Sequence, residues 1–217
     1  MPSRAEVDEF RRALNSLSAA AWREFAPVWE RIQYADFPLI REVLAEVWPA
    51  LIERYGDMSA TVAADLFEDW SPGDAATLVR GVDEARAMVR ARWAIGSTAA
   101  AGNLAMLVDE LVKQPARSTM AASARGNGRG YARVPTGAET CAFCLMLASR
   151  GYTYETAASA GEMRKFHGDC DCAVVVGDVP GYDPGELYER FAAARRDAGS
   201  GSTKKVLAAL REREDSH

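Results

Sequence analysis

The residues of this sequence that are best suited to chemistry lie between positions 141 and 172. The stretch holds all four cysteines of the chain, as Cys141-Ala-Phe-Cys144 and Cys170-Asp-Cys172, and one of its two histidines, His167. The other histidine, His217, is the last residue. Thiolate and imidazole groups are the usual protein ligands of zinc. Their concentration in one stretch predicts a single zinc site.

A structural zinc ion takes four Cys or His ligands in a tetrahedron, usually supplied as two close pairs. Cys141 and Cys144 form one pair, because a two-residue spacing allows a single turn to direct both sulfurs at one ion. The second pair must come from His167, Cys170 and Cys172, which together offer one ligand too many. We favour His167 and Cys170, which are also separated by two residues, with Cys172 as the alternate ligand.

Other roles for these side chains make different predictions. Two disulfides, or buried thiols without a shared role, are the alternatives to a metal site, although clustered cysteines in a reducing cytosol are more often metal ligands. Four protein ligands leave no open position on zinc, and a His-Glu-x-x-His motif is impossible with one internal histidine. An enzyme would therefore use His167 without zinc, together with Asp169 or Asp171, as a protease or nuclease.

The bulk composition is that of an ordinary globular protein. Of 217 residues, 48% are apolar and 26% charged, and 26 Lys and Arg against 31 Asp and Glu give a net charge of -5. This balance argues against a protein devoted to coating nucleic acid, but it is compatible with a local basic patch. The polar residues after Met1 and the absence of a long apolar run predict neither a signal peptide nor a membrane span.

The cysteine-containing stretch follows a long region with helical periodicity. Apolar residues recur at steps of three and four in five successive runs, which predict helices over residues 7–32, 40–55, 58–70, 78–93 and 97–115. We expect Pro27 to kink or split the first helix and Gly56 to end the second. All five tryptophans fall in this half. The stripes predict a helix-bundle core, with an assembly interface as the alternative use of part of this surface.

A glycine-rich segment, residues 125–130, interrupts the helical pattern and is the best domain boundary in the sequence. It divides a helical region, residues 1–124, from a smaller domain, residues 125–217. Arg125, Arg129 and Arg133 lie in or beside it and are the candidate nucleic-acid-binding residues. The spacing does not match a Walker phosphate loop, so a flexible linker is favoured.

The second region is expected to be small and mixed. Short β-prone runs at residues 131–134, 152–154 and 174–176 predict strands. Asp183 and Pro184 then form a helix start, and a last amphipathic helix contains Val206, Leu207 and Leu210. So small a domain buries little surface, whereas structural zinc contributes on the order of 10 kcal/mol in peptides. The predicted fold is mainly α: a helical bundle followed by a small α+β zinc-stapled domain and C-terminal helices.

Three segments of this region resemble a known family. The run Arg133-Val-Pro-Thr-Gly-Ala-Glu-Thr-Cys-Ala-Phe-Cys-Leu-Met-Leu-Ala-Ser-Arg-Gly151, the segment His167-Gly-Asp-Cys-Asp-Cys172, and Gly181-Tyr-Asp-Pro184 ahead of Leu187-Tyr188 are similar to the Mu F-like minor capsid (head morphogenesis) proteins of tailed phages, in the branch found in actinobacteria. The resemblance covers about residues 133–188. Upstream of Arg125 it rests only on a helical, alanine-rich segment.

The resemblance implies a virion component located in the capsid interior or portal region, and in the host cytoplasm during assembly. Its expected partners are portal and capsid proteins, and packaged DNA is a further candidate. Our leading hypothesis is a non-catalytic minor capsid protein whose C-terminal domain is stabilised by zinc. The alternatives are a capsid maturation protease or nuclease that uses His167, and a DNA-binding module of the packaged head.

Overall fold

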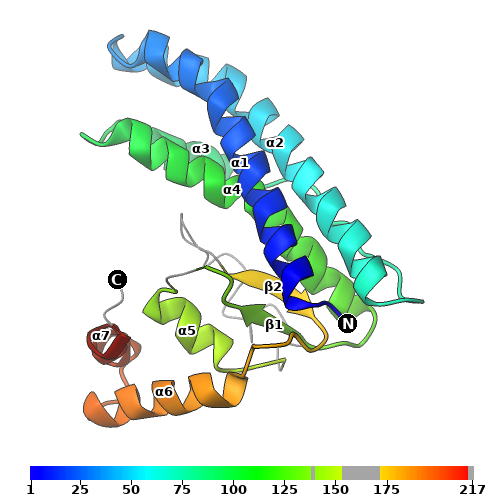
Figure 1. The fold of residues 1–217 in the computed structure, drawn as a ribbon. Coiled ribbons are helices and arrows are strands. Elements are labelled where there is room, and N and C mark those ends of the chain that lie inside the picture. The colour runs from blue at the N-terminus through cyan, green and yellow to red at the C-terminus, as the bar shows by residue number, and fades with distance from the viewer. Residues whose placement is uncertain (138–139, 153–171, 215–217) are drawn as a thin grey trace.

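The computed structural model describes residues 1–137, 140–152 and 172–214, and in these residues the chain forms seven helices and two short strands (Figure 1). The prediction of a mainly helical fold is confirmed. The elements are α1 (Arg4–Ile32), α2 (Phe37–Trp70), α3 (Glu84–Ile95), α4 (Ala100–Gly126), β1 (Tyr131–Val134), α5 (Ala142–Ala148), β2 (Ala173–Val176), α6 (Pro184–Asp197) and α7 (Thr203–Glu214).

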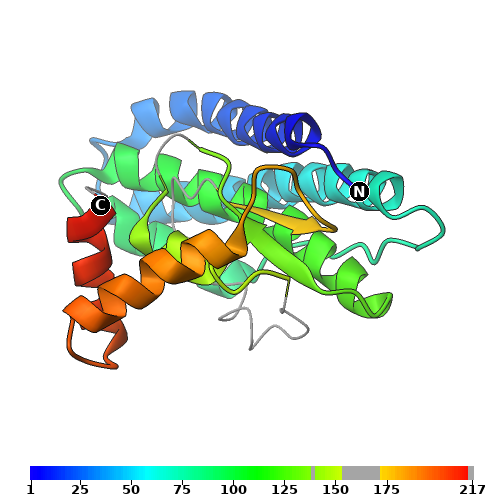
Figure 2. The same cartoon turned by 60° about the horizontal axis from the view of Figure 1, so that its bottom comes forward.

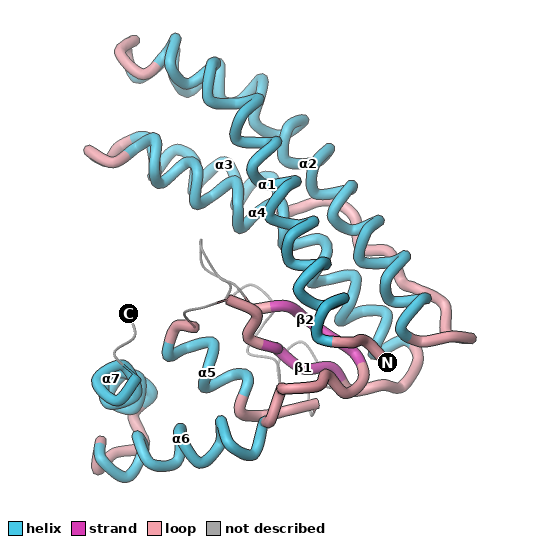
Figure 3. Tube along the Cα trace, viewed as in Figure 1, coloured by secondary structure: helices cyan, strands magenta, loops and turns pink. Residues whose placement is uncertain are grey.

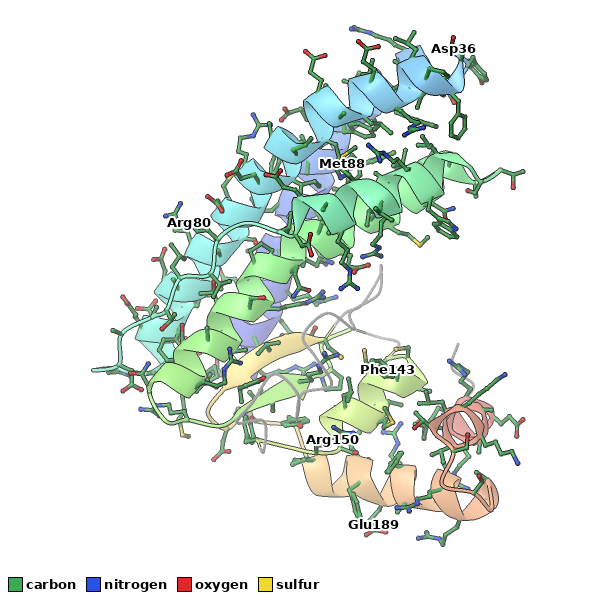
Figure 4. The ribbon with its side chains drawn as sticks, turned by 180° about the vertical axis from the view of Figure 1, so that it is seen from behind. Asp36, Arg80, Met88, Phe143, Arg150 and Glu189 are labelled. Atoms are coloured by element: carbon green, nitrogen blue, oxygen red, sulfur yellow. The ribbon has the colours of Figure 1, made fainter. Side chains whose placement is uncertain are left out.

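The first two helices form a long antiparallel pair with well-capped starts. Ser3 and Glu6 make a reciprocal capping box before α1, in which the Ser3 backbone N–H donates to the Glu6 carboxylate at 2.7 Å. At the far end of the pair, Asp36 accepts a hydrogen bond from the Leu39 backbone N–H at 3.0 Å and starts α2. Figure 4 labels Asp36 at this tip.

Two predicted helix ends are wrong, because α2 runs through Gly56 and α4 runs through Pro115, and α1 is not split at Pro27. An isolated helix would lose about 3 kcal/mol or more at an internal proline, but α1 keeps a continuous buried face that includes Phe25 and Trp29 on either side of it. Gly56 is buried against α4, where a Cβ at its position would lie 3.1 Å from Pro115 Cγ. It therefore permits close helix packing and does not cap a helix.

The helix predicted over residues 78–93 begins later, at Glu84, and an extended segment precedes it (Figure 3). Side-chain hydroxyl groups of α4 satisfy the backbone of this segment: the Thr77 N–H donates to Ser123 Oγ at 2.8 Å, and the Val79 N–H donates to Thr119 Oγ1 at 3.0 Å. These hydrogen bonds replace the backbone hydrogen bonds that a helix would supply. No local sequence pattern predicts them.

The apolar stripe predicted on this helix lies largely on its outer face. Val89 is 62% exposed and Trp93 is 73% exposed, whereas Ala87, Ala91 and Ala94 are buried. Alanine on the inner face lets α3 approach its neighbours closely, so the larger apolar side chains are left on the surface. Scattered exposed apolar residues are common, but an exposed Trp one turn from an exposed Val is a feature of interaction surfaces.

The long helices share two cores. The distal core joins the α1–α2 tip to α3 and the start of α4 through residues such as Phe25, Trp48 and Leu104. The sheet core joins the other ends of α1, α2 and α4 to both strands, and its buried members include Phe10, Phe67, Met120 and Val174. The sheet core thus contains residues from both sides of position 124 and does not separate the two predicted domains. The domain boundary at 124–125 stays a prediction.

The two strands pair antiparallel, with Tyr131 opposite Val176 and Val134 opposite Ala173. Both were predicted from their β-branched and aromatic residues, and every residue of each is buried. The strand predicted over residues 152–154 lies outside the described residues except for Tyr152. The sheet lies beside α1 and α4 through β2 and beside α5 through β1.

The C-terminal helices form a third cluster with α5, built on Ala142, Leu145, Ala194 and Leu210. Asp183 caps α6 by accepting from the Gly185 and Glu186 backbone N–H groups at 2.8 and 3.1 Å, with Pro184 at the first helical position, as predicted. Figure 1 shows α6 and α7 beyond α5 and away from the long helices, and Figure 2 brings α6 to the front. No described helix is long and apolar enough to cross a membrane.

Candidate metal site

The first predicted ligand pair lies at the start of α5. Cys141 is the N-cap residue, with extended backbone angles, and its Sγ accepts a hydrogen bond from the Cys144 backbone N–H at 3.4 Å. Cys141 is partly exposed and Cys144 is buried. Figure 4 labels Phe143, between the two cysteines, and Arg150, just beyond the other end of the helix. The turn therefore brings both cysteines to one end of α5, as their spacing predicted.

Cys172 lies immediately before β2 and is 3% exposed. The next residue, Ala173, pairs with Val134 at the end of β1, from which the chain continues towards α5. Cys144 and Cys172 are members of the sheet core, and Cys141 packs against it. The fold thus places three of the five candidate ligands at one core, although they come from segments 28 residues apart.

The remaining candidate ligands, His167 and Cys170, lie outside the described residues, as do Asp169 and Asp171. Within the part of the chain that the structure describes, no three His, Cys, Asp or Glu side chains are grouped so that they could hold a metal ion. Also within that part, no disulfide joins Cys141, Cys144 and Cys172 to one another. The choice between Cys170 and Cys172 as a ligand therefore stays open.

Tyr152 fixes the chain just before the segment that contains His167. Its hydroxyl oxygen accepts a hydrogen bond from the Val179 backbone N–H at 3.1 Å, and its ring makes an edge contact with Tyr182 at a centroid distance of 5.7 Å. Burial raises the pKa of Tyr152 to about 12, although the Val179 N–H opposes the shift. A Cβ at Gly130 would lie 2.0 Å from the Tyr152 carbonyl oxygen, so this approach requires glycine.

Cys172 also lines a very small recess between α1, α4 and the sheet, together with Arg11, Lys113 and Arg117. Lys113 and Arg117 are only 7% and 3% exposed, and the Lys113 ammonium forms an ion pair with Asp109 at 2.6 Å. The cationic surroundings of Cys172 were missed by sequence reasoning. The available signal was the pair Lys113 and Arg117, spaced by four residues on a helix whose neighbouring positions are apolar.

The three arginines proposed for nucleic acid do not form one exposed surface. Arg133 is fully buried in β1. Arg129 is exposed but forms an ion pair with Asp74, and Arg125 hydrogen-bonds the Tyr131 side chain. Burial raises the pKa of Tyr131, and the nearby Arg125 opposes that shift. Arg133 is thus inaccessible, whereas Arg125 and Arg129 are exposed and each has a partner within the fold.

Comparison with known proteins places the sequence among phage proteins. A family model described as VG15 protein matches residues 1–194. The Gene 15 protein of Mycobacterium phage D29 is 35% identical over 107 residues, which cover 36% of this chain and 39% of the relative. The Gene 15 protein of Mycobacterium phage L5 is 33% identical over 103 residues, covering 31% and 34%. The chain thus matches well under half the length of these relatives. No solved structure matches it significantly.

Proposed function

The chain belongs to the VG15 protein family, which has relatives in mycobacteriophages, and on this premise we propose that it is a non-catalytic minor capsid or head morphogenesis protein of the Mu F-like type. The family match carries the proposal, because it extends over residues 1–194 and so includes the segments that resemble Mu F-like proteins. The proposed location is the virion, in the capsid interior or portal region, and the proposed partners are portal and capsid proteins.

Zinc is proposed as the structural cofactor, with Cys141, Cys144, His167 and Cys170 as ligands and Cys172 as the alternate. The capped turn that holds Cys141 and Cys144 supports a shared site, because it brings two soft ligands to one end of α5. His167 and Cys170 are preferred as the second pair because they share the two-residue spacing of Cys141 and Cys144.

The exposed apolar residues of the helical region support an assembly role. On α3, Val89 and Trp93 are separated by one turn and face solvent. At the α1–α2 tip, Tyr34 is 91% exposed and Phe37 is 49% exposed. Interfaces are enriched in aromatic residues, which contribute much of their binding energy. We assign the contact with portal or capsid proteins to these surfaces.

The test of this function is the composition of purified particles. Phage particles that carry an epitope-tagged copy of the gene are purified by density centrifugation and analysed by quantitative mass spectrometry. The expected result is the chain at a few copies per particle, at a constant ratio to portal protein across gradient fractions. Its absence from particles that contain portal and capsid proteins would overturn the assignment.

A second arm tests the assembly surface. The double variant Val89→Ser/Trp93→Ser should lower the copy number in particles while the purified protein keeps its melting temperature, because both side chains are largely exposed. The matched control is Leu78→Ser, at an apolar residue that is 37% exposed and lies outside α3. Equal incorporation of the double variant and the wild type would exclude this part of α3 as the contact.

A further inference from the structure

Two stretches of the chain concentrate positive charge. Residues 113–133 contain five Lys or Arg and no acid, and residues 195–211 contain five Lys or Arg and one acid, Asp197. Both contrast with the whole chain, whose net charge is -5. From sequence alone, either stretch could bind a polyanion. The exposure of the Lys and Arg side chains distinguishes them.

The cations of the first stretch are engaged or inaccessible. Arg117 and Arg133 are buried, Lys113 is buried in its ion pair with Asp109, and Arg129 pairs with Asp74. The fifth, Arg125, hydrogen-bonds the Tyr131 side chain. Arg125 and Arg129 are exposed, but each already has a partner within the fold, so no cation of this stretch is both exposed and unengaged.

The cations of the second stretch are all exposed: Arg195, Arg196, Lys204, Lys205 and Arg211. No acid among the described residues forms an ion pair with any of them, and the one acid of the stretch, Asp197, is bound to Arg213 at 2.5 Å. Glu212 follows the stretch directly and lowers its net charge by one. The fold thus leaves this positive charge accessible to solvent.

The helix pair presents these cations around one corner of the molecule. Arg195 and Arg196 are in the last turn of α6, and Lys204 and Lys205 are in the first turn of α7, on either side of the five-residue connection 198–202. Arg211 lies seven residues after Lys204 and so on the same face of α7. The pairs Arg190–Glu214 and Arg213–Asp197 join the two helices, whose corner is seen in Figure 2.

We infer that the α6–α7 corner is a binding site for duplex DNA, which it contacts through phosphate groups without reading sequence. Four or five accessible cations on two helices joined by ion pairs suit a regular row of phosphates, and release of condensed counterions would supply most of the free energy. The inference deepens the proposed function, because it names DNA as a partner inside the head. It also relocates the expected contact from Arg125, Arg129 and Arg133 to a different part of the fold.

The experiment measures fluorescence anisotropy of a labelled duplex of about 30 base pairs with the purified full-length chain, between about 50 and 200 mM salt. The variant replaces Arg195, Arg196, Lys204 and Lys205 with Gln. We expect its affinity at the lowest salt to fall at least about 10-fold, and the slope of log affinity against log salt to become shallower by about 3 to 4. Circular dichroism should show an unchanged melting curve, since all four side chains are exposed.

The matched control removes the same charge from exposed positions on α1 and α2, by changing Arg12, Arg23, Arg31 and Arg41 to Gln. This variant should bind within about threefold of wild type and keep its salt slope. An equal loss in both variants, or no salt-dependent binding by the wild type, would overturn the inference. Binding to phosphatidylserine vesicles without binding to DNA would also overturn it, in favour of a lipid surface. Because the assay uses purified protein, its failure leaves the particle-composition result unaffected.

Discussion

Pro115 of α4 packs directly on Gly56 of α2, where an added Cβ would lie 3.1 Å from Pro115 Cγ. One turn along α2, Ser59 Oγ lies 2.6 Å from the Val112 carbonyl oxygen and donates a hydrogen bond towards α4. Two residues that normally disrupt helices therefore face each other between α2 and α4, and the missing side chain of Gly56 leaves room for the Pro115 ring. This contact lies between the distal core and the sheet core.

The contact predicts an unusual response to a glycine substitution. Gly56→Ala gains about 1 kcal/mol of helix propensity but forces the Pro115 ring to move, which costs about 1 to 3 kcal/mol in a packed core. We expect the free energy of unfolding to fall by about 1 kcal/mol, measured by urea denaturation. Gly102→Ala is the control, because no atom lies within 4 Å of a Cβ there, and it should be neutral or stabilising. A more stable Gly56→Ala protein would show that the contact yields without cost.

Much of the helical region could be predicted from periodicity, and in the C-terminal region the helix start at Asp183 and the two strands follow from local signals. The errors at Gly56 and Pro115 arose because local propensity was given more weight than tertiary packing. The exposed face of α3 was missed for a related reason. The large apolar residues of α3 were expected to be buried, but its alanine face packs against the neighbouring helices instead.

The proposed zinc ligands predict different zinc contents for four cysteine variants. Serine substitution of Cys141, Cys144 or Cys170 should abolish stoichiometric zinc, measured by elemental analysis of the purified protein, whereas Cys172→Ser should retain it. Zinc content is the readout because burying a serine hydroxyl at position 172 costs about 1 to 3 kcal/mol whether or not a metal binds. Loss of zinc from Cys172→Ser with retention by Cys170→Ser would reverse the ligand assignment.

His167 separates the structural role from a catalytic one. Under the zinc proposal, His167→Ala should lower the melting temperature and the zinc content together, because a structural ion stabilises the fold that holds it. Adding a chelator to the wild type should reproduce that melting temperature. An unchanged melting temperature and zinc content in the variant would be incompatible with His167 as a ligand.

Tyr152 predicts a loss of stability at alkaline pH. Its pKa is about 12 in the folded protein and about 10 when unfolded, so its contribution is complete below pH 10 and is lost as the pH rises to 12. The loss is at most about 3 kcal/mol. Tyr152→Phe should flatten the fall in urea midpoint between pH 10 and 12 that the wild type shows, and Tyr34→Phe, at a 91% exposed position, should not. An equally steep fall in Tyr152→Phe would contradict the assignment.

The third hydrophobic cluster, which joins α5 to α6 and α7, predicts that α6 and α7 can lose stability without the long helices. Leu210 is 1% exposed and packs with Ala142, Leu145 and Ala194, so Leu210→Ala should destabilise α6 and α7 by about 2 to 4 kcal/mol. Hydrogen exchange followed by mass spectrometry should show faster exchange in these two helices and unchanged protection in α1 and α2. Leu39→Ala, at a 46% exposed position, is the control. Faster exchange across the whole chain would show that the cluster is coupled to the other cores.

The candidate site was only partly predictable. The spacing correctly predicted that Cys141 and Cys144 lie together, because residues three apart in sequence lie on one helical turn. Spacing could not show that Cys172 lies beside cations of α1 and α4, since that contact joins segments more than 50 residues apart in sequence. The same reason explains the arginines: sequence shows that Arg133 is charged, and only the pairing of β1 with β2 shows that it is buried.

The length of α2 separates the two proposed binding surfaces. Its 34 residues extend about 50 Å, and the aromatic tip beside Asp36 lies at the end of the molecule opposite to α6 and α7 (Figure 1). A ligand on the cationic corner would therefore not compete for space with a protein seated on Tyr34 and Phe37. If both proposals hold, a single chain would bridge two different partners at once, and its long helices would set the separation between them.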